Sequence, residues 1–162
     1  MHVTAVLSLK GGVGKTTVVL GLAGAAMRRG LRTLVVDLDP QGNATTALEP
    51  DASESTIAQA LERPSASVLA GSIAPSAWGD DLDVLVGSED IERHNHPDPG
   101  SQRLGRLSRL LSALPRSDDD GDGSLARYDL VVIDCPPSLG QLTRSALVAV
   151  DRAVLEIGRA HV

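Results

Sequence analysis

Residues 10–17 read KGGVGKTT, and this glycine-rich stretch lies between an apolar run and a segment of helical periodicity. The apolar run, residues 3–9 (VTAVLSL), contains β-branched residues and predicts a buried strand. After the stretch, apolar residues recur at helical spacing from Thr16 to Arg29, and Gly30 provides a stop signal. A glycine-rich turn between a strand and a helix is the local structure that a phosphate-binding loop requires.

The residue types of this loop suit the binding of phosphate. Its glycines allow backbone N–H groups to turn inward around phosphate oxygens, and the helix N-terminus adds the positive end of its dipole. Lys15 supplies a positive charge, and Thr16 offers a hydroxyl to Mg²⁺. The usual G-x-x-x-x-G-K-[ST] spacing would put a glycine where Leu9 stands, so the loop is a variant, and the alternative is a glycine-rich turn with incidental lysines. The predicted binding residues are Gly11, Gly12, Val13, Gly14, Lys15, Thr16 and Thr17.

Two acids follow the next apolar run, Thr33 to Val36, which predicts a second strand joined to the first by a parallel crossover. Asp37 and Asp39 are two positions apart, so both side chains should leave the same face at the sheet edge where ligands bind. Beside a phosphate site with Mg²⁺, such carboxylates order metal-bound water or the attacking water. The alternative is a pair of solvated turn acids.

A third acid, Asp134, ends the apolar run from Tyr128 to Ile133 and fits a carboxylate that a buried strand delivers to Mg²⁺. Pro136 and Pro137 stiffen the chain after it, and Gly140 can act as a hinge. This suits a switch segment that responds to a γ-phosphate, while a plain strand stop is the alternative interpretation of the prolines.

The remaining pattern completes an α/β fold with a mainly parallel sheet and helices on both faces. We expect the loop at 10–16, Asp39 and Asp134 to converge on one edge of this sheet. The segment SDDDGDGS at 117–124 predicts a solvated acidic connector. Further expected elements are a short helix at 56–61, a strand at 82–86, an amphipathic helix from Arg103 to Leu114, a helix with Leu142, Ala146, Leu147 and Val150 in register, and a strand from Arg152.

Composition restricts the class of protein. A chain of 162 residues, 42% of them hydrophobic, suits one globular domain. Its single cysteine indicates a reducing compartment, and the lack of any run of 18 apolar residues predicts a cytoplasmic protein without a membrane contact. A net charge of −6 and an aromatic content of 1% argue against broad nucleic-acid binding by this segment alone.

Four other residues are weaker candidates for a functional site. Cys135 has no His or Cys at metal-ligand spacing, which predicts a packed thiol. His94 and His96 could hold a metal, but they lie in a Pro- and Gly-containing segment without a third ligand, so a solvated loop is favoured. Trp78 is a lone aromatic residue that we expect to pack.

Three segments taken together carry a family resemblance. KGGVGKTT, DLDPQGNAT at 37–45 and DLVVIDCPPSLG at 129–140 stand in this order, and the chain resembles the ParA/Soj partition ATPases of the deviant Walker A P-loop class. The resemblance runs from Val3 to about Leu155 and is weakest from 62 to 127. It implies the P-loop NTPase fold.

The resemblance also implies roles for individual residues. Lys10 matches the signature lysine that reaches the nucleotide of the partner subunit, and Lys15 matches the phosphate-binding lysine. Asp39 matches the acid associated with hydrolysis, so Lys10, Lys15 and Asp39 are the expected catalytic residues. Asp134 matches the Walker B acid, and the expected metal-site residues are Thr16, Asp39 and Asp134.

Members of this family bind ATP and Mg²⁺, form an ATP-dependent homodimer and coat DNA non-specifically. A ParB-like DNA-binding partner stimulates their ATP hydrolysis, and the system segregates plasmids or chromosomes. The resemblance therefore implies a cytoplasmic ATPase that is nucleoid-associated if full-length. A related positioning ATPase that acts on another cargo is an alternative.

The length departs from the family pattern, because family domains continue beyond this chain and contribute adenine contacts and DNA-binding residues there. We therefore expect residues 1–155 to be the N-terminal part of a ParA-type domain. The last seven residues, EIGRAHV at 156–162, can be encoded by a common sequencing-adapter sequence, so we interpret them as a non-native tail, with a natural strand end as the alternative. A truncated, non-enzymatic fragment is accordingly the second hypothesis for this chain.

Overall fold

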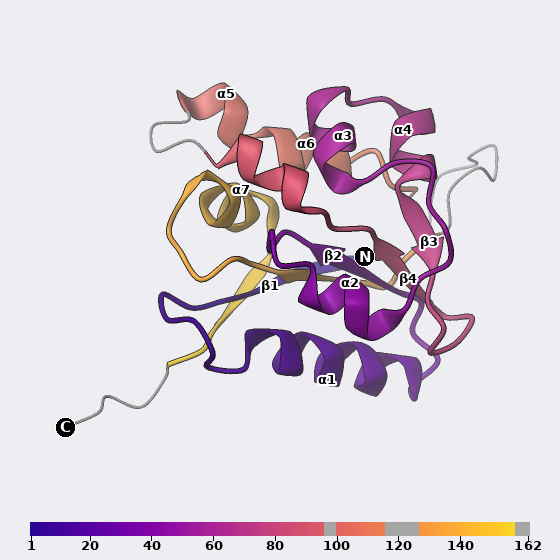
Figure 1. Ribbon diagram of the computed structural model, residues 1–162. Helices are drawn as coiled ribbons and strands as arrows, with labels where there is room; N and C mark the ends of the chain where they lie inside the picture. Colours follow the sequence, from indigo (N-terminus) through magenta and orange to yellow (C-terminus); the bar gives the residue numbers. More distant parts are fainter. Residues whose placement is uncertain (96–99, 116–126, 158–162) are drawn as a thin grey trace.

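The computed structural model describes residues 1–95, 100–115 and 127–157. Its centre is a six-stranded sheet in the order β3-β4-β2-β5-β1-β6 (Figure 1). All neighbouring strands are parallel except β3 and β4, which are antiparallel. The predicted α/β class is therefore confirmed. The strands are β1 (His2–Leu7), β2 (Thr33–Asp37), β3 (Ile73–Pro75), β4 (Leu82–Leu85), β5 (Leu130–Asp134) and β6 (Arg152–Leu155).

Helices cover both faces of the sheet (Figure 1). On one face, α1 (Lys15–Met27) and α2 (Asn43–Leu48) pack in a core that includes Val6, Val35 and Val132. The strand neighbours of these valines point to the opposite face, as the period of two requires. That face carries a larger core and is covered by α3 (Ile57–Glu62), α4 (Ala66–Gly71), the 3-10 helix η1 (Glu89–His94), α5 (Gly100–Leu104), α6 (Arg106–Leu111) and α7 (Gln141–Ala149).

Several sequence predictions need correction. The helix expected from Arg103 to Leu114 is two short helices interrupted at Gly105, because glycine has a low helix propensity. Its apolar side is nevertheless buried through Leu107, Leu110, Leu111 and Leu114. In α7, Leu147 is 43% exposed, since it lies five positions after Leu142, about 140° away around the helix.

The structure also contains four short elements that the sequence analysis did not predict, because their segments are short and polar or mixed in composition: β3, α2, α4 and η1. By contrast, the helix expected from Thr56 is present as α3. The side chain of Thr56 caps it and Gln59 Oε1 accepts the Thr56 N–H at 2.8 Å.

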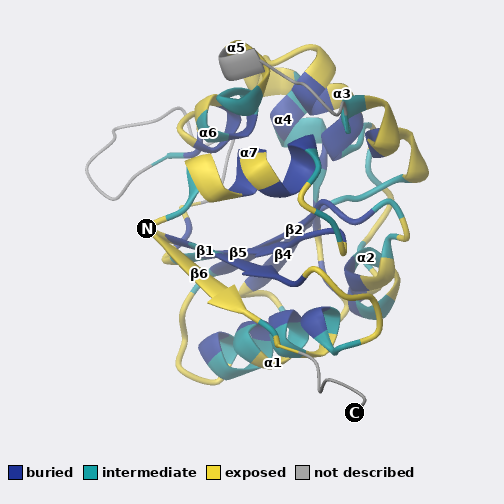
Figure 2. Cartoon of the chain, turned by 90° about the vertical axis from the view of Figure 1, so that its left-hand side faces the viewer, coloured by how far each residue is buried: buried dark blue, intermediate teal, exposed yellow. Residues whose placement is uncertain are grey.

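One edge of the sheet is exposed. All four residues of β6 are solvent-exposed, in contrast to the buried strands beside it (Figure 2). The Glu156 N–H still donates to the Leu7 carbonyl at 2.9 Å, so pairing continues one residue past β6. Residues 158–162 of the expected tail, His96 and the acidic segment at 117–124 lie outside the described residues. In the part of the chain that the structure describes, no helix is long and apolar enough to cross a membrane.

Candidate functional site: a phosphate-binding loop facing strand-end carboxylates

The glycine-rich loop leads from β1 into α1, which begins at Lys15. Gly12 and Gly14 adopt positive φ angles of 71° and 103°, a conformation that side-chain-bearing residues rarely take. Lys15 is only 7% exposed, and the loop borders a cavity of about 410 Å³. This cavity is lined by Gly11, Gly12, Gly14, Lys15, Thr16, Thr17, Asp39, Gln41, Asn43 and Pro137. Six of the seven predicted loop residues thus share one cavity with Asp39, and Val13 is the exception.

Asp134 meets the loop directly. It is the last residue of β5, and its Oδ2 accepts a hydrogen bond of 2.7 Å from Thr16 Oγ1. The expected convergence of the loop and the β5 end on one edge of the sheet is therefore confirmed. The second carboxylate oxygen of Asp134, Oδ1, is buried and has no hydrogen-bond partner among the described residues. A buried carboxylate oxygen without a partner is costly, and this suits a site that a cation or its water completes.

The electrostatics of Asp134 support this interpretation. Burial, with smaller contributions from the neighbouring carboxylates Asp37 and Asp39, raises the pKa of Asp134 to about 7. The Thr16 hydrogen bond and the charge of Lys15 act in the opposite direction. A group with this pKa is partly protonated at neutral pH, and a bound cation would favour its charged form.

Asp37 does not have the role that the sequence suggested. Its carboxylate is fully buried, and Oδ2 accepts hydrogen bonds of 2.8 Å from both the backbone N and Oγ1 of Thr45. Oδ1 accepts the Asp39 N–H at 3.2 Å. Gly87 packs against the Asp37 side chain, and Asp37 does not line the phosphate cavity. Asp37 therefore holds α2 and the 37–45 segment in place, and burial raises its pKa.

Asp39 and Lys10 occupy different places. Asp39 is nearly buried at the cavity wall, and its Oδ1 accepts the Gln41 N–H at 3.0 Å. Lys10 is exposed and borders a separate hollow with Leu155 and Ile157. The structure therefore does not bring Lys10 into the phosphate cavity of its own subunit.

Three further residues line the cavity: residue-by-residue reasoning missed Gln41 and Asn43, and it assigned Pro137 only to a switch segment. All three lie within the segments quoted for the family resemblance, so the motif as a whole carried the signal. Sequence reasoning also missed Thr45, whose side chain anchors Asp37 and also accepts the Gly87 N–H at 3.0 Å.

The weaker candidates behave as follows. Cys135 is a packed thiol, as predicted, and burial raises its pKa to about 12. No group of three or more His, Cys, Asp or Glu side chains within the described ranges could hold a metal ion. His94 instead contacts the Ala58 carbonyl through Nε2 at 3.1 Å. Trp78 is 42% exposed and donates through Nε1 to the Ala47 carbonyl at 3.0 Å.

Comparison with known proteins places this geometry in a family. The AAA domain model AAA_31 matches residues 1–161. The sporulation initiation inhibitor protein Soj of Bacillus subtilis is 37% identical over 163 residues, which cover 96% of this chain and 57% of Soj. The chromosome partitioning protein ParA of Myxococcus xanthus is 37% identical over 158 residues, covering 91% of this chain and 49% of that protein. The chain belongs to the ParA/Soj family.

Solved structures agree with this assignment at the level of the fold. A cobyrinic acid a,c-diamide synthase from Mycobacterium smegmatis with bound ADP and magnesium matches with a TM-score of 0.80 and 32% identity, covering 97% of this chain and 60% of that one. A plasmid partition protein from Borrelia burgdorferi matches with a TM-score of 0.77 and 22% identity. The predicted P-loop NTPase fold and ParA/Soj membership are therefore confirmed. The chain spans about half to three fifths of the length of these relatives.

Proposed function

We propose that this protein is a magnesium-dependent switch that binds and hydrolyses ATP in plasmid or chromosome partitioning. One observation carries the proposal: the Thr16 hydroxyl and the Asp134 carboxylate meet at 2.7 Å beside the phosphate loop. In P-loop NTPases, a loop hydroxyl and a strand-end acid at this position serve the magnesium ion of a bound nucleotide. The bound ADP and magnesium of the cobyrinic acid a,c-diamide synthase structure support the same ligands here.

The residues present fit a magnesium ion. Mg²⁺ prefers oxygen ligands and retains several waters, so the Thr16 hydroxyl and the unpartnered Asp134 Oδ1 suffice on the protein side. When bound, magnesium would neutralise charge on the phosphate oxygens. Asp39, on the same cavity wall, would act on the magnesium-bound or attacking water.

Lys15 and the loop amides would hold the phosphates. The near-buried Lys15 ammonium at the start of α1 supplies a charge that is poorly screened by solvent. Attack of water on the γ-phosphorus breaks its bond to the bridging oxygen and yields ADP and phosphate. Asp39 would orient that water, because its carboxylate faces the cavity rather than an internal salt bridge.

Substitution of Lys15 and Asp39 tests these roles separately. Lys15→Ala should abolish ATP binding, measured by calorimetric titration, since the phosphate charge is lost. Asp39→Ala should keep ATP binding while hydrolysis falls by about a hundredfold, the range of a lost acid–base or water-orienting group. Lys10 is the only other lysine of the chain, so Lys10→Ala is the matched control for ATP binding. Equal loss of ATP binding in Lys15→Ala and Asp39→Ala would assign Asp39 to the structure or the metal site instead.

Lys10 is proposed to act across a dimer. It is exposed and lies outside the phosphate cavity of its own subunit, and it matches the signature lysine of the family, which reaches the nucleotide of the partner subunit. Lys10→Ala should leave ATP binding intact and abolish the ATP-dependent dimer in sedimentation. An unchanged dimer would contradict this role.

We infer the partners of this protein, and the parts that its activity requires, from the family. A ParB-like DNA-binding protein would stimulate hydrolysis, and non-specific DNA binding would reside in a C-terminal part present in longer relatives. Because the chain spans only 57% of Soj, a non-enzymatic fragment is the second candidate. Turnover of ATP by residues 1–162 at the rate of a C-terminally extended chain would exclude that candidate.

A further inference from the structure

A second cavity lies among α3, η1, α5, α6 and α7, on the face of the sheet opposite α1 (Figure 1). It has a volume of about 220 Å³ and is lined by Glu62, Arg93, His94, Arg103, Arg106 and Gln141. Its inner end continues into a narrow apolar recess among Leu38, Leu61, Leu107 and Leu142. None of the residues that line this cavity lines the phosphate cavity.

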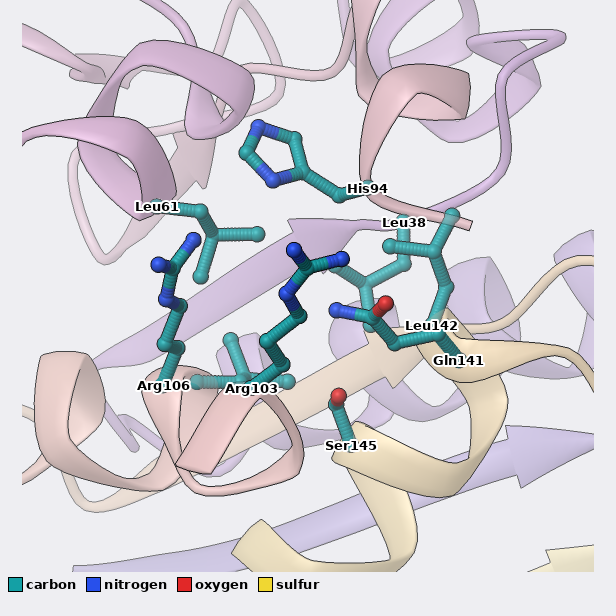
Figure 3. A pocket seen from close by; sticks show the side chains of 9 residues that line it. Leu38, Leu61, His94, Arg103, Arg106, Gln141, Leu142 and Ser145 are labelled. Carbon is teal, nitrogen blue, oxygen red and sulfur yellow. The ribbon is translucent and has the colours of Figure 1, made fainter. Parts of the chain in front are cut away.

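The cavity collects positive charge in a chain whose net charge is −6. The side chains of Arg103 and Arg106 make no hydrogen bond or ion pair with any residue in the described ranges. Their side chains extend side by side from α5 and α6, with the His94 imidazole beyond their ends (Figure 3). Arg93 is paired with Asp90 at 3.2 Å, and Glu62 is the single acid among the lining residues.

His94 adds a titratable group to these arginines. The Ala58 carbonyl can only accept, so Nε2 of His94 carries the proton that forms the 3.1 Å contact. In the neutral ring Nδ1 therefore has no proton, and protonation would turn it into a second donor. Burial lowers the pKa of His94, Arg106 and Arg93 lower it further, and Glu62 raises it. An anion beside the ring would have the opposite effect of burial.

We propose that this cavity is an anion site that binds the phosphate group of inorganic phosphate or of a small phosphate monoester. Guanidinium groups bind phosphate oxygens through paired N–H donors, and two arginines without other partners supply two such forks. A cavity of about 220 Å³ admits a phosphate group with a few further atoms. The leucines at its inner end exclude water and strengthen the attraction between the guanidinium groups and the anion.

The site adjoins both chain segments that line the phosphate cavity. Leu38, in its apolar recess, lies between Asp37 and Asp39 in sequence, and Gln141 follows the segment that contains Pro137. Next to His94, the Asn95 side chain packs so closely on Gly140 that a Cβ there would overlap it. An occupant would therefore contact the same chain segments that border the phosphate cavity.

Nuclear magnetic resonance of the histidine imidazoles in the whole protein tests the site. Inorganic phosphate should shift the His94 resonance saturably and raise its pKa, and His94→Gln identifies the signal. A double variant, Arg103→Gln with Arg106→Gln, should weaken phosphate binding by about tenfold or more, since bonds from charged donors are lost. Arg109→Gln is the matched control, because Arg109 lies on α6 but donates to the Gln102 carbonyl and does not line the cavity. The same titration with glycerol phosphate shows whether the site prefers inorganic phosphate or a phosphate monoester, because the preferred anion binds more tightly.

The phosphate loop is a competing site, and Lys15→Ala separates the two. A His94 response that persists in Lys15→Ala and is lost in the arginine double variant supports the second site, even if the proposed ATPase function fails. A response that disappears in Lys15→Ala, or is the same in the double variant and in Arg109→Gln, would overturn the proposal. So would the absence of any saturable shift with either anion.

Discussion

The parallel strands begin at one edge of the sheet and end at the other, and the two edges use carboxylates in opposite ways. We call the edge at which the parallel strands begin the amino edge. There Asp83 accepts hydrogen bonds from Arg32 Nη2 at 3.0 Å and from the Tyr128 hydroxyl at 2.8 Å. Asp129 and Asp151, just before β5 and β6, accept the backbone N–H groups of Arg32 and Val3, both at 2.9 Å. Each of these acids is paired with a cation or accepts a hydrogen bond within the fold, and we therefore call the amino edge the closed edge.

At the carboxyl edge, where the strands end, two acids remain available to bind a ligand, and we call this edge the open edge. Asp134 keeps one buried oxygen without a partner in the described part of the chain, and Asp39 faces a cavity of about 410 Å³. Asp37 alone is fully bonded there, and its bonds position the segment that carries Asp39. The difference shows that burial of an acid does not by itself mark a functional group. A buried acid that the fold leaves incompletely bonded is the better candidate for one.

The largest effect on stability is expected at the closed edge. Asp83→Ala leaves the Tyr128 hydroxyl and the Arg32 guanidinium without their partner, which should lower the free energy of unfolding by about 2–3 kcal/mol. The value is below that of a fully buried pair because the Arg32 side chain is 40% exposed. Urea denaturation measures it. Asp81→Ala, at an exposed neighbouring position, should change the free energy by less than about 0.5 kcal/mol, and an equal loss in both variants would refute the comparison.

At the open edge, removal of the carboxylate charge of Asp134 should raise the free energy of unfolding rather than lower it. The pKa of Asp134 is raised from 3.8 to about 7 by burial, so without nucleotide and magnesium the folded state binds its proton more tightly than the unfolded state. Stability from this group is present below about pH 4 and is lost as pH rises to about 7. Asp134→Asn should therefore stabilise the ligand-free protein by on the order of 2 kcal/mol at pH 8 and by little at pH 4. Destabilisation at pH 8 would mean that the carboxylate is satisfied in the fold.

A smaller effect is expected from the packing behind the open edge. A Cβ at Gly87 would stand 2.9 Å from Asp37 Cγ, so Gly87→Ala should displace the carboxylate and cost about 1–2 kcal/mol. At Gly21, inside α1, no atom beyond its chain neighbours and the local helix backbone lies within 4 Å of the position that an alanine methyl would take, so Gly21→Ala should instead stabilise by about 0.5–1 kcal/mol. Thermal unfolding of the two variants measures the difference. Stabilisation by Gly87→Ala would show that Asp37 is free to move.

The sequence alone predicted the parts of the site that lie at strand ends and carry a recognisable local motif. Glycine spacing identified the loop, and the acids at the ends of β2 and β5 identified the edge, because parallel strands bring their carboxyl ends together. It was not sufficient to distinguish Asp37 from Asp39, since both follow the same strand. That distinction depends on Thr45 and Gly87, the latter far along the chain, and only tertiary packing brings them together.

The middle of the chain was hard to predict for a related reason. β3 has three residues and is the single antiparallel strand in the described sheet, so no periodicity could reveal it. The second cavity combines residues from five helical elements, each of which is short and has no distinctive motif in its sequence.

The most direct test of the central claim is the gain in unfolding free energy that MgATP gives to three proteins: the unchanged chain, Lys15→Ala and Asp83→Ala. A ligand that binds only the folded state at a hundred times its dissociation constant adds about 2.7 kcal/mol. If the carboxyl edge is the nucleotide site and the amino edge is purely structural, the gain appears in the unchanged chain and in Asp83→Ala and vanishes in Lys15→Ala. A full gain in Lys15→Ala, or none in the unchanged chain, would contradict the account.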